Sequence, residues 1–390
     1  CAVDVVGGLT HKRATLHTRH TMSADASCTA PPIRGMYSTS FLGTQGSIAQ
    51  RVEAWHSTAC PWEEVRHSGY FNTYEETELA TQYAVEHIPC AKRADRDRAE
   101  FARRMAGRRF FFAGDSVMRQ YTEAFLCRLR ASLRVVHDGM PWIRQWPSNQ
   151  WGHCYANYSA SGPHQGGLQH CFMKAGCVVF EGDVRVCYML SQWCLPHVFL
   201  SDGIFKRMAN NLFKEHGAGV QTYLVMTHGM HMQVGHMCDA YHWSRVKKLG
   251  PKHLQYMLRD AKVEPSKFSF VYKELDATHF PAKSGLYQHY AYNHNRSKWH
   301  CGPVNPGDPI PPMRRLELDH GLPAIENLRH AGVPVHILRT FEAGLADGPR
   351  LHATHASKPG SGNRSIDCLH WMMPGIPDVW VEQLLEAALK

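Results

Sequence analysis

The feature that most constrains the fold of this chain is the stretch from Arg108 to Gln120, where a short apolar run enters a Gly-Asp-Ser turn. The run extends from Phe110 to Ala113. After the turn, apolar and aromatic residues recur at three- and four-residue spacing, as in a helix with one buried face; they are Met118, Tyr121, Phe125 and Leu129. The stretch therefore predicts a buried strand, a sharp turn and a helix.

The predicted turn places Ser116 at the boundary between strand and helix. A hydroxyl at this position lies beside the free backbone N–H groups of a helix N-terminus, which stabilise a developing oxyanion. Ser116 is therefore a candidate nucleophile. The simpler alternative is that Ser116 or Asp115 only caps the helix.

A second stretch near the C-terminus supplies the groups that a nucleophilic serine needs. Asp367 and His370 are three residues apart, shortly before a predicted final helix. A histidine removes the serine proton, and a carboxylate holds its tautomer and stabilises the imidazolium. Ser116, Asp367 and His370 are thus predicted to form a catalytic triad.

Together the two stretches resemble the PC-esterase group of the SGNH/GDSL hydrolase superfamily, which includes the plant trichome-birefringence-like polysaccharide O-acetyltransferases. The resemblance rests on Gly114-Asp115-Ser116 with Arg119-Gln120, and on Asp367-Cys368-x-His370-Trp371 followed by Pro374-Gly375-x-Pro377-Asp378-x-Trp380. It extends over residues 55–390. It implies an α/β fold, namely an SGNH-hydrolase-like three-layer α/β/α sandwich with a central parallel sheet, an irregular N-terminal lobe and long insertions.

Two shorter segments between these stretches also resemble the family. Thr278-His279-Phe280 matches a segment ending in His-Phe, and Val225 to His231 matches a strand ending in Asn-x-Gly-x-His. Thr227 stands where the family usually has an oxyanion-binding Asn, and loss of one such donor typically costs about a hundred- to a thousandfold in rate. Three outcomes stay open: Thr227 substitutes, Asn210 or Asn211 reaches the site, or activity is weak.

The resemblance assigns further residues to the site. The oxyanion and pocket residues would be Gly114, Asp115, Thr227 and Gly229. The substrate-binding residues would be Arg119, His231, His279 and Trp371, with a purely structural salt bridge as the alternative for Arg119. No metal is expected, because His228, His231 and His236 do not have the spacing of a helical metal motif. No cofactor is expected beyond an acetyl donor as co-substrate.

The charge balance is basic. Lys and Arg number 43 and Asp and Glu 34, which gives a net charge of +9, and 27 His add charge at mildly acidic pH. Such a balance favours an acidic partner, such as an anionic polysaccharide, a phosphate-rich surface or nucleic acid. The sequence contains no nucleic-acid-binding motif, and a generally basic surface is the simpler interpretation.

Cysteine content and glycosylation sequons favour the secretory lumen (Golgi) or the extracellular space. The 13 Cys are not arranged as zinc-binding pairs, and sequons begin at Asn157, Asn295 and Asn363. The resemblance implies that Cys368 is disulfide-bonded, with Cys301 as the expected partner. No apolar run reaches the roughly 18 residues of a membrane span. Relatives carry an N-terminal anchor, so we expect membrane attachment only through such a segment. Other protein subunits are possible partners.

The chain divides into three predicted regions: an extended arm (1–50), a Cys- and aromatic-rich lobe (51–107) whose charged helix (91–107) ends at Gly107, and a catalytic domain (108–390) with insertions at about 138–176 and 283–311. Apolar patterning predicts further strands at 133–137, 177–180, 184–190, 221–227, 268–275 and 333–338. It predicts helices at 202–216, 239–261, 312–330 and after a cap at Asp378, with a Gly-rich loop at 342–364. Strands that alternate with helices favour a parallel sheet covered on both faces.

The resemblance implies O-acetyl transfer to a glycan hydroxyl through an acetyl-serine intermediate. The triad is equally consistent with hydrolysis by a carbohydrate O-acetyl esterase. A catalytically weak or inactive SGNH-fold binding or structural protein is the third possibility, because Thr227 departs from the family pattern.

Overall fold

A seven-stranded, mostly parallel sheet forms the centre of the molecule. The computed structural model describes residues 98–130, 132–139, 175–190, 213–215, 217, 219–228, 239–279, 301–302, 310–341, 352–356, 364–371 and 376–390. The strands are β1 (Arg108–Gly114), β2 (Val135–Asp138), β3 (Ala175–Phe180), β4 (Val184–Leu190), β5 (Gln221–Thr227), β6 (Phe268–Lys273) and β7 (Val335–Leu338). Their order is β2-β3-β4-β1-β5-β6-β7, and β4, β1, β5, β6 and β7 run parallel. The predicted sheet is therefore present, with an antiparallel β2-β3 edge.

Strand β1 lies in the middle of the sheet, which explains its unbroken apolar sequence. It pairs with β4 on one side and β5 on the other, so both of its faces are covered. Side chains alternate between the two faces of a strand. Phe110 and Phe112 belong to one hydrophobic core, and Phe111 and Ala113 belong to the other.

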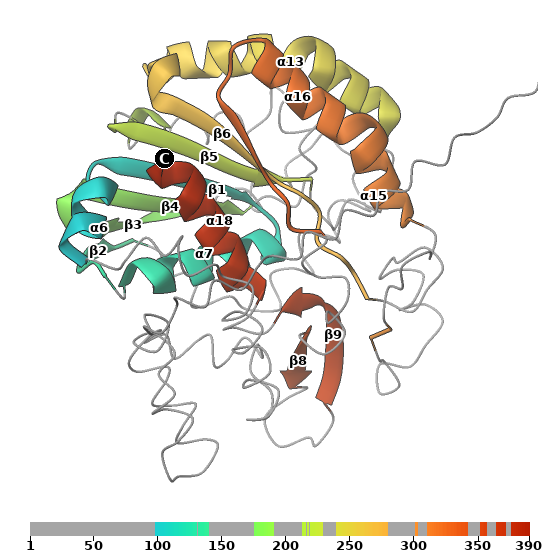
Figure 1. The fold of residues 1–390 in the computed structure, drawn as a ribbon, viewed down its shortest axis with the longest axis horizontal. Coiled ribbons are helices and arrows are strands. Elements are labelled where there is room, and N and C mark those ends of the chain that lie inside the picture. The colour runs from blue at the N-terminus through green and yellow to red at the C-terminus, as the bar shows by residue number, and fades with distance from the viewer. Residues whose placement is uncertain are drawn as a thin grey trace, which may run out of the picture.

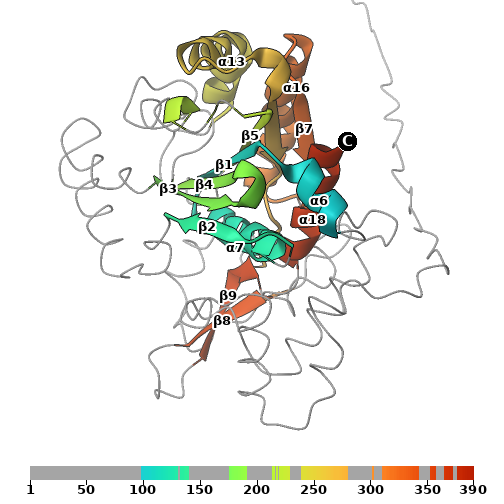
Figure 2. The same ribbon diagram turned by 90° about the vertical axis from the view of Figure 1, so that its left-hand side faces the viewer.

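Helices cover the sheet on both faces, as Figures 1 and 2 show. On one face lie α6 (Arg98–Met105), α7 (Ser116–Arg130) and α18 (Ile376–Leu389), which share a core with β1 and β4. On the other lie α13 (Ala240–Asp260) and α16 (Leu322–His330). This is a three-layer α/β arrangement, as predicted. Within the described residues, no helix has the length and apolar character needed to cross a membrane.

Several element boundaries differ from the sequence-based predictions. The expected loop at 342–364 contains strand β8 (His352–Ala356), which pairs with β9 (Arg364–Trp371). Asp367 and His370 therefore lie in a strand. The expected helix at 312–330 is α15 (Pro312–Leu316), a π-helical segment (Glu317–Gly321) and α16. Asp378 lies inside the first turn of α18 and does not precede it.

Two disulfides connect described residues. Cys301–Cys368 is the predicted pair and links β9 to a distant segment. Cys177–Cys187 joins β3 to β4 and was not predicted. Disulfides of this kind fit a chain that folds in an oxidising compartment. The predicted arm (1–50), most of the lobe (51–107), the helix at 202–216 and most of both insertions lie outside the described residues.

Candidate active site

The Gly-Asp-Ser turn is held in one geometry at the carboxyl end of β1. The Asp115 carboxylate accepts hydrogen bonds from the N–H groups of Val117 (3.1 Å) and Met118 (3.3 Å), so Asp115 caps α7. The Tyr188 hydroxyl donates to the carbonyls of Gly114 (3.0 Å) and Asp115 (2.9 Å). Position 114 requires glycine, because a Cβ there would lie 2.6 Å from Cβ of Met118.

Ser116 and His370 are in direct contact, although 254 positions separate them in sequence. Ser116 Oγ lies 2.7 Å from His370 Nε2, which is hydrogen-bonding distance. Ser116 begins α7, and His370 lies near the end of β9. The capping alternative therefore holds for Asp115, and the role of Ser116 as nucleophile stays a prediction.

Residues on both sides of His370 are anchored. The Gln120 amide forms two hydrogen bonds with the backbone of Trp371: its Nε2 donates to the carbonyl, and its Oε1 accepts from the N–H at 3.1 Å. On the other side, Cys368 is held by its disulfide to Cys301, and its carbonyl accepts from His279 N–H at 3.1 Å. Gln120 lies one helical turn after Ser116, so α7 carries Ser116 and also anchors the residue next to His370.

Trp371 and His279 are buried beside this segment, with exposed fractions of 0% and 1%. Their rings meet edge to face at 5.8 Å, and Trp371 also meets Trp380 of α18 at 6.4 Å. Trp371 ends β9, the strand that carries His370, and His279 packs on the Trp371 ring; contact of either residue with substrate stays a prediction. Arg119 lies 3.5 Å from the carboxylate of Glu123 within α7, and its predicted substrate contact is likewise untested.

Thr227 ends the neighbouring strand β5 and lies beside the turn. Its methyl group is 3.6 Å from where a Cβ on Gly114 would be. Within the part of the chain that the structure describes, the Thr227 side chain makes no hydrogen bond. The next residue, His228, is fully buried and stacks on Trp243 of α13 at 5.2 Å. Burial lowers the pKa of His228 to about 3, so the ring is neutral.

A buried charged cluster follows β6 at the same edge of the sheet. Lys273 Nζ lies 2.5 Å from the Asp276 carboxylate and 3.9 Å from the centre of the Trp380 ring. Burial raises the pKa of Asp276 to about 6, Lys273 opposes that rise, and the charge of Asp115 adds to it. Glu317 accepts from the Tyr272 hydroxyl at 2.5 Å and from Leu275 N–H at 2.9 Å.

Sequence reasoning missed this cluster and the role of Gln120. A Lys-Glu-x-Asp run after a buried strand was visible in the sequence, but nothing local indicated that these charges are buried. Gln120 belonged to the family-like motif, yet its partner Trp371 is 251 residues away.

Other predicted site residues are only partly placed. Asp367 lies in β9, three residues before His370, but its side chain is outside the described part of the structure. Gly229, His231, Asn210 and Asn211 lie outside the described residues, as do the sequon residues Asn157, Asn295 and Asn363. Among the residues that are described, no three His, Cys, Asp or Glu side chains form a metal-binding group.

Comparison with known proteins does not identify a family for this chain. No protein-family model matches the sequence, and no curated protein matches it significantly.

Proposed function

We propose that this chain is a serine acyltransferase of the SGNH type that moves an acetyl group onto a glycan hydroxyl. The observation that carries the proposal is the 2.7 Å contact between Ser116 Oγ and His370 Nε2. The position of Ser116 at the start of α7, after a central parallel strand, adds support, because sites in such sheets lie beyond the carboxyl ends of strands.

The first half-reaction acylates the serine. His370 Nε2 takes the Ser116 proton while Oγ attacks the carbonyl carbon of the acetyl donor. The tetrahedral intermediate then collapses, and the bond to the leaving group breaks as the imidazolium returns the proton to that group. Asp367 would orient the imidazole and stabilise its charged form.

The oxyanion of the intermediate requires donors at the turn. Asp115 engages the N–H groups of Val117 and Met118. We therefore assign the oxyanion to the N–H of Ser116 and to the hydroxyl of Thr227, a residue whose methyl group lies beside Gly114. Thr227 then replaces the Asn that the family resemblance leads one to expect.

The second half-reaction transfers the acetyl group to the acceptor. A glycan hydroxyl attacks the acetyl-serine while His370 takes its proton, and Ser116 leaves with the proton that the histidine returns. Water in the place of the glycan would give a carbohydrate esterase with the same residues. The glycan acceptor is inferred from the family-like motifs, and the two disulfides fit the oxidising lumen of the Golgi or the extracellular space.

The test is a transfer assay with p-nitrophenyl acetate as donor and a panel of acetyl-free polysaccharides as acceptors. Acetyl groups found on polysaccharide, absent with Ser116→Ala, would support the transferase. Release of acetate at a rate that no acceptor changes would favour an esterase. Release that is the same for Ser116→Ala and the parent chain would contradict both.

A further inference from the structure

Helix α13 carries an unusual concentration of positive charge. From Ala240 to Arg259 it contains no Asp or Glu, and Asp260, its last residue, pairs with Lys214 at 3.0 Å. Like charges three or four residues apart destabilise a helix by about 0.2–0.5 kcal/mol per pair. The arrangement therefore carries a local cost that an anionic partner would offset.

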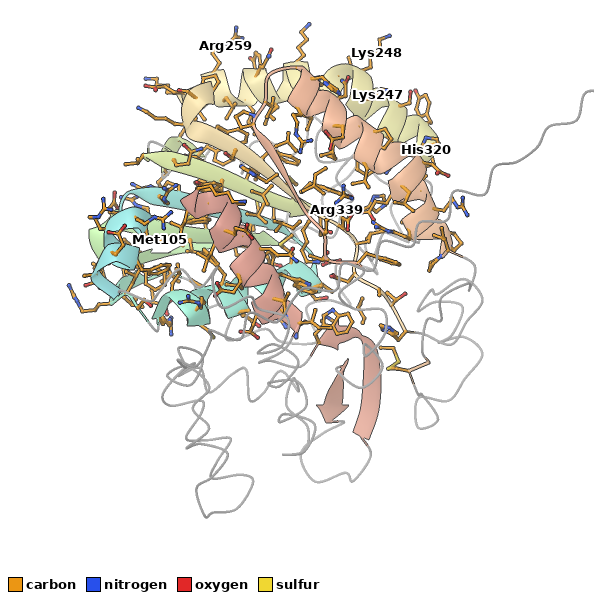
Figure 3. All side chains as sticks on the ribbon, viewed as in Figure 1. Met105, Lys247, Lys248, Arg259, His320 and Arg339 are labelled. Carbon is orange, nitrogen blue, oxygen red and sulfur yellow. A yellow bond between two sulfur atoms is a disulfide. The ribbon has the colours of Figure 1, made fainter. Side chains whose placement is uncertain are left out.

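Four of the five Lys and Arg residues of α13, all except Lys247, lie along one line of its exposed face. Steps of three and four residues return to the same side of a helix. Six exposed residues of α13 follow one another at these steps, and we term them the cationic stripe: Tyr241, Arg245, Lys248, Lys252, Tyr256 and Arg259. Eighteen residue steps span about 27 Å along the axis. Figure 3 shows Lys248 and Arg259 projecting from the outer side of α13, away from the sheet.

The four cations of the stripe are not neutralised by nearby acids. Within the described residues, none of them has a carboxylate within 4 Å. Arg245 and Arg259 lie over the rings of Tyr241 (6.0 Å) and Tyr256 (4.9 Å). The two tyrosines are 64% and 52% exposed.

The surroundings of the stripe discriminate between classes of anionic partner. The apolar residues of α13, which membrane insertion would require, are buried in the core; they include Trp243, Val246 and Leu254. Two disulfides fit an oxidising compartment, where nucleic acid is not a usual partner. Tyrosine rings in line with cations suit a chain of sugar rings that carry carboxylates, because the rings pack on apolar sugar faces while the cations meet the charges.

We propose that the cationic stripe binds a carboxylated polysaccharide. The first turn of α13 packs close to the end of β5, because Trp243 stacks on His228, the residue after Thr227. Binding itself is independent of catalysis. That the bound polysaccharide is also the acetyl acceptor rests on the proposed function.

The experiment measures binding of the full chain to polygalacturonate, with fully methyl-esterified polygalacturonate as the neutral probe. The test variant changes Arg245, Lys248, Lys252 and Arg259 to Gln. The matched control changes four exposed cations on other elements to Gln and so removes the same net charge; these are Arg104, Arg134, Lys267 and Lys390. We expect the test variant to weaken polygalacturonate binding about tenfold or more. We expect the control to bind like the parent chain and the neutral probe not to bind.

Equal weakening in both variants, or an unchanged test variant, would overturn the proposal. So would tighter binding to duplex DNA or to phosphatidylserine vesicles at the same ionic strength. Thermal unfolding of each variant checks that the fold is intact. Ser116→Ala should bind polygalacturonate like the parent chain, so loss of catalysis and loss of stripe binding are separate results.

Discussion

Helices α7 and α13 follow neighbouring parallel strands of one sheet and start at the same edge, but their surroundings are opposite. In α7 every residue except Arg119 and Arg130 is buried, because the helix lies between the sheet, α18 and β9. In α13 only six residues of twenty-one are buried, and the outer face is cationic. The comparison indicates that α7 fixes a reactive geometry, whereas α13 presents a surface.

The largest expected effect is on the α7 side. His370→Ala should lower kcat/KM for p-nitrophenyl acetate about 10,000-fold, because Ser116 loses its base. His253→Gln, a histidine change on α13, should leave this rate unchanged. A similar loss from both variants would contradict the division of roles between the helices.

The second-largest effect on the rate is expected at Thr227, the last residue of β5. Thr227→Val keeps the shape of the side chain and removes its hydroxyl, which should lower kcat about a hundred- to a thousandfold if Thr227 binds the oxyanion. Thr227→Asn restores an amide donor and should keep activity near that of the parent chain. An unchanged rate for Thr227→Val would remove this residue from the mechanism.

Gln120 of α7 is bonded to the backbone of Trp371 in β9, and substitutions at Gln120 test whether this connection supports catalysis. Gln120→Leu removes both hydrogen bonds to Trp371 and should lower kcat about a hundredfold with little change in KM, because His370 is displaced. Gln120→Glu keeps the acceptor for Trp371 N–H and should be intermediate. Thr122→Val is the matched control, since its hydroxyl bonds only within α7, to Met118 O. Equal effects of Gln120→Leu and Thr122→Val on kcat would indicate general damage to the helix.

The contact between His228, which follows β5, and Trp243 of α13 makes the stability of the fold depend on pH. His228 has a folded-state pKa of about 3, and an unfolded histidine has a pKa near 6.5. As pH falls below about 6.5, the unfolded chain takes up a proton that the folded chain does not, so stability decreases. The loss from this residue should reach about 2 kcal/mol at pH 5. His228→Phe, which keeps a ring on Trp243, should reduce the fall in unfolding free energy between pH 7.5 and 5 by that amount. An identical fall in the two proteins would contradict the assignment.

The sequence predicted the central elements well because their signals are local. Strands β1 and β5 are buried on both faces, so each appears in the sequence as an almost unbroken apolar run. Helix α13 is buried on one face, so its apolar residues recur at helical spacing. Strand β8 was missed because His352 to Ala356 lack apolar alternation and pair outside the main sheet. The π-helical segment was missed because Glu317 accepts bonds from Tyr272 and Leu275, residues over forty positions away.

The contact between Ser116 and His370 could be predicted from the sequence, but the residues that hold it in place could not. Ser116 and His370 were found because each stands in a short motif, and their contact agrees with the predicted pairing. The second anchor of β9, Gln120, depends on a hydrogen bond across 251 positions. Tyr188 bonds to the carbonyls of the Gly-Asp-Ser turn, but no motif in strand β4 marks this residue, so its role could not be predicted.

The central claim is that His370 activates Ser116, and fluorophosphonate labelling followed by intact-mass measurement tests it most directly. We expect one label per chain on the folded protein, no label on Ser116→Ala, and much slower labelling of Gln120→Leu than of Thr122→Val. A folded chain that takes up no label, or a label that persists in Ser116→Ala, would contradict the claim.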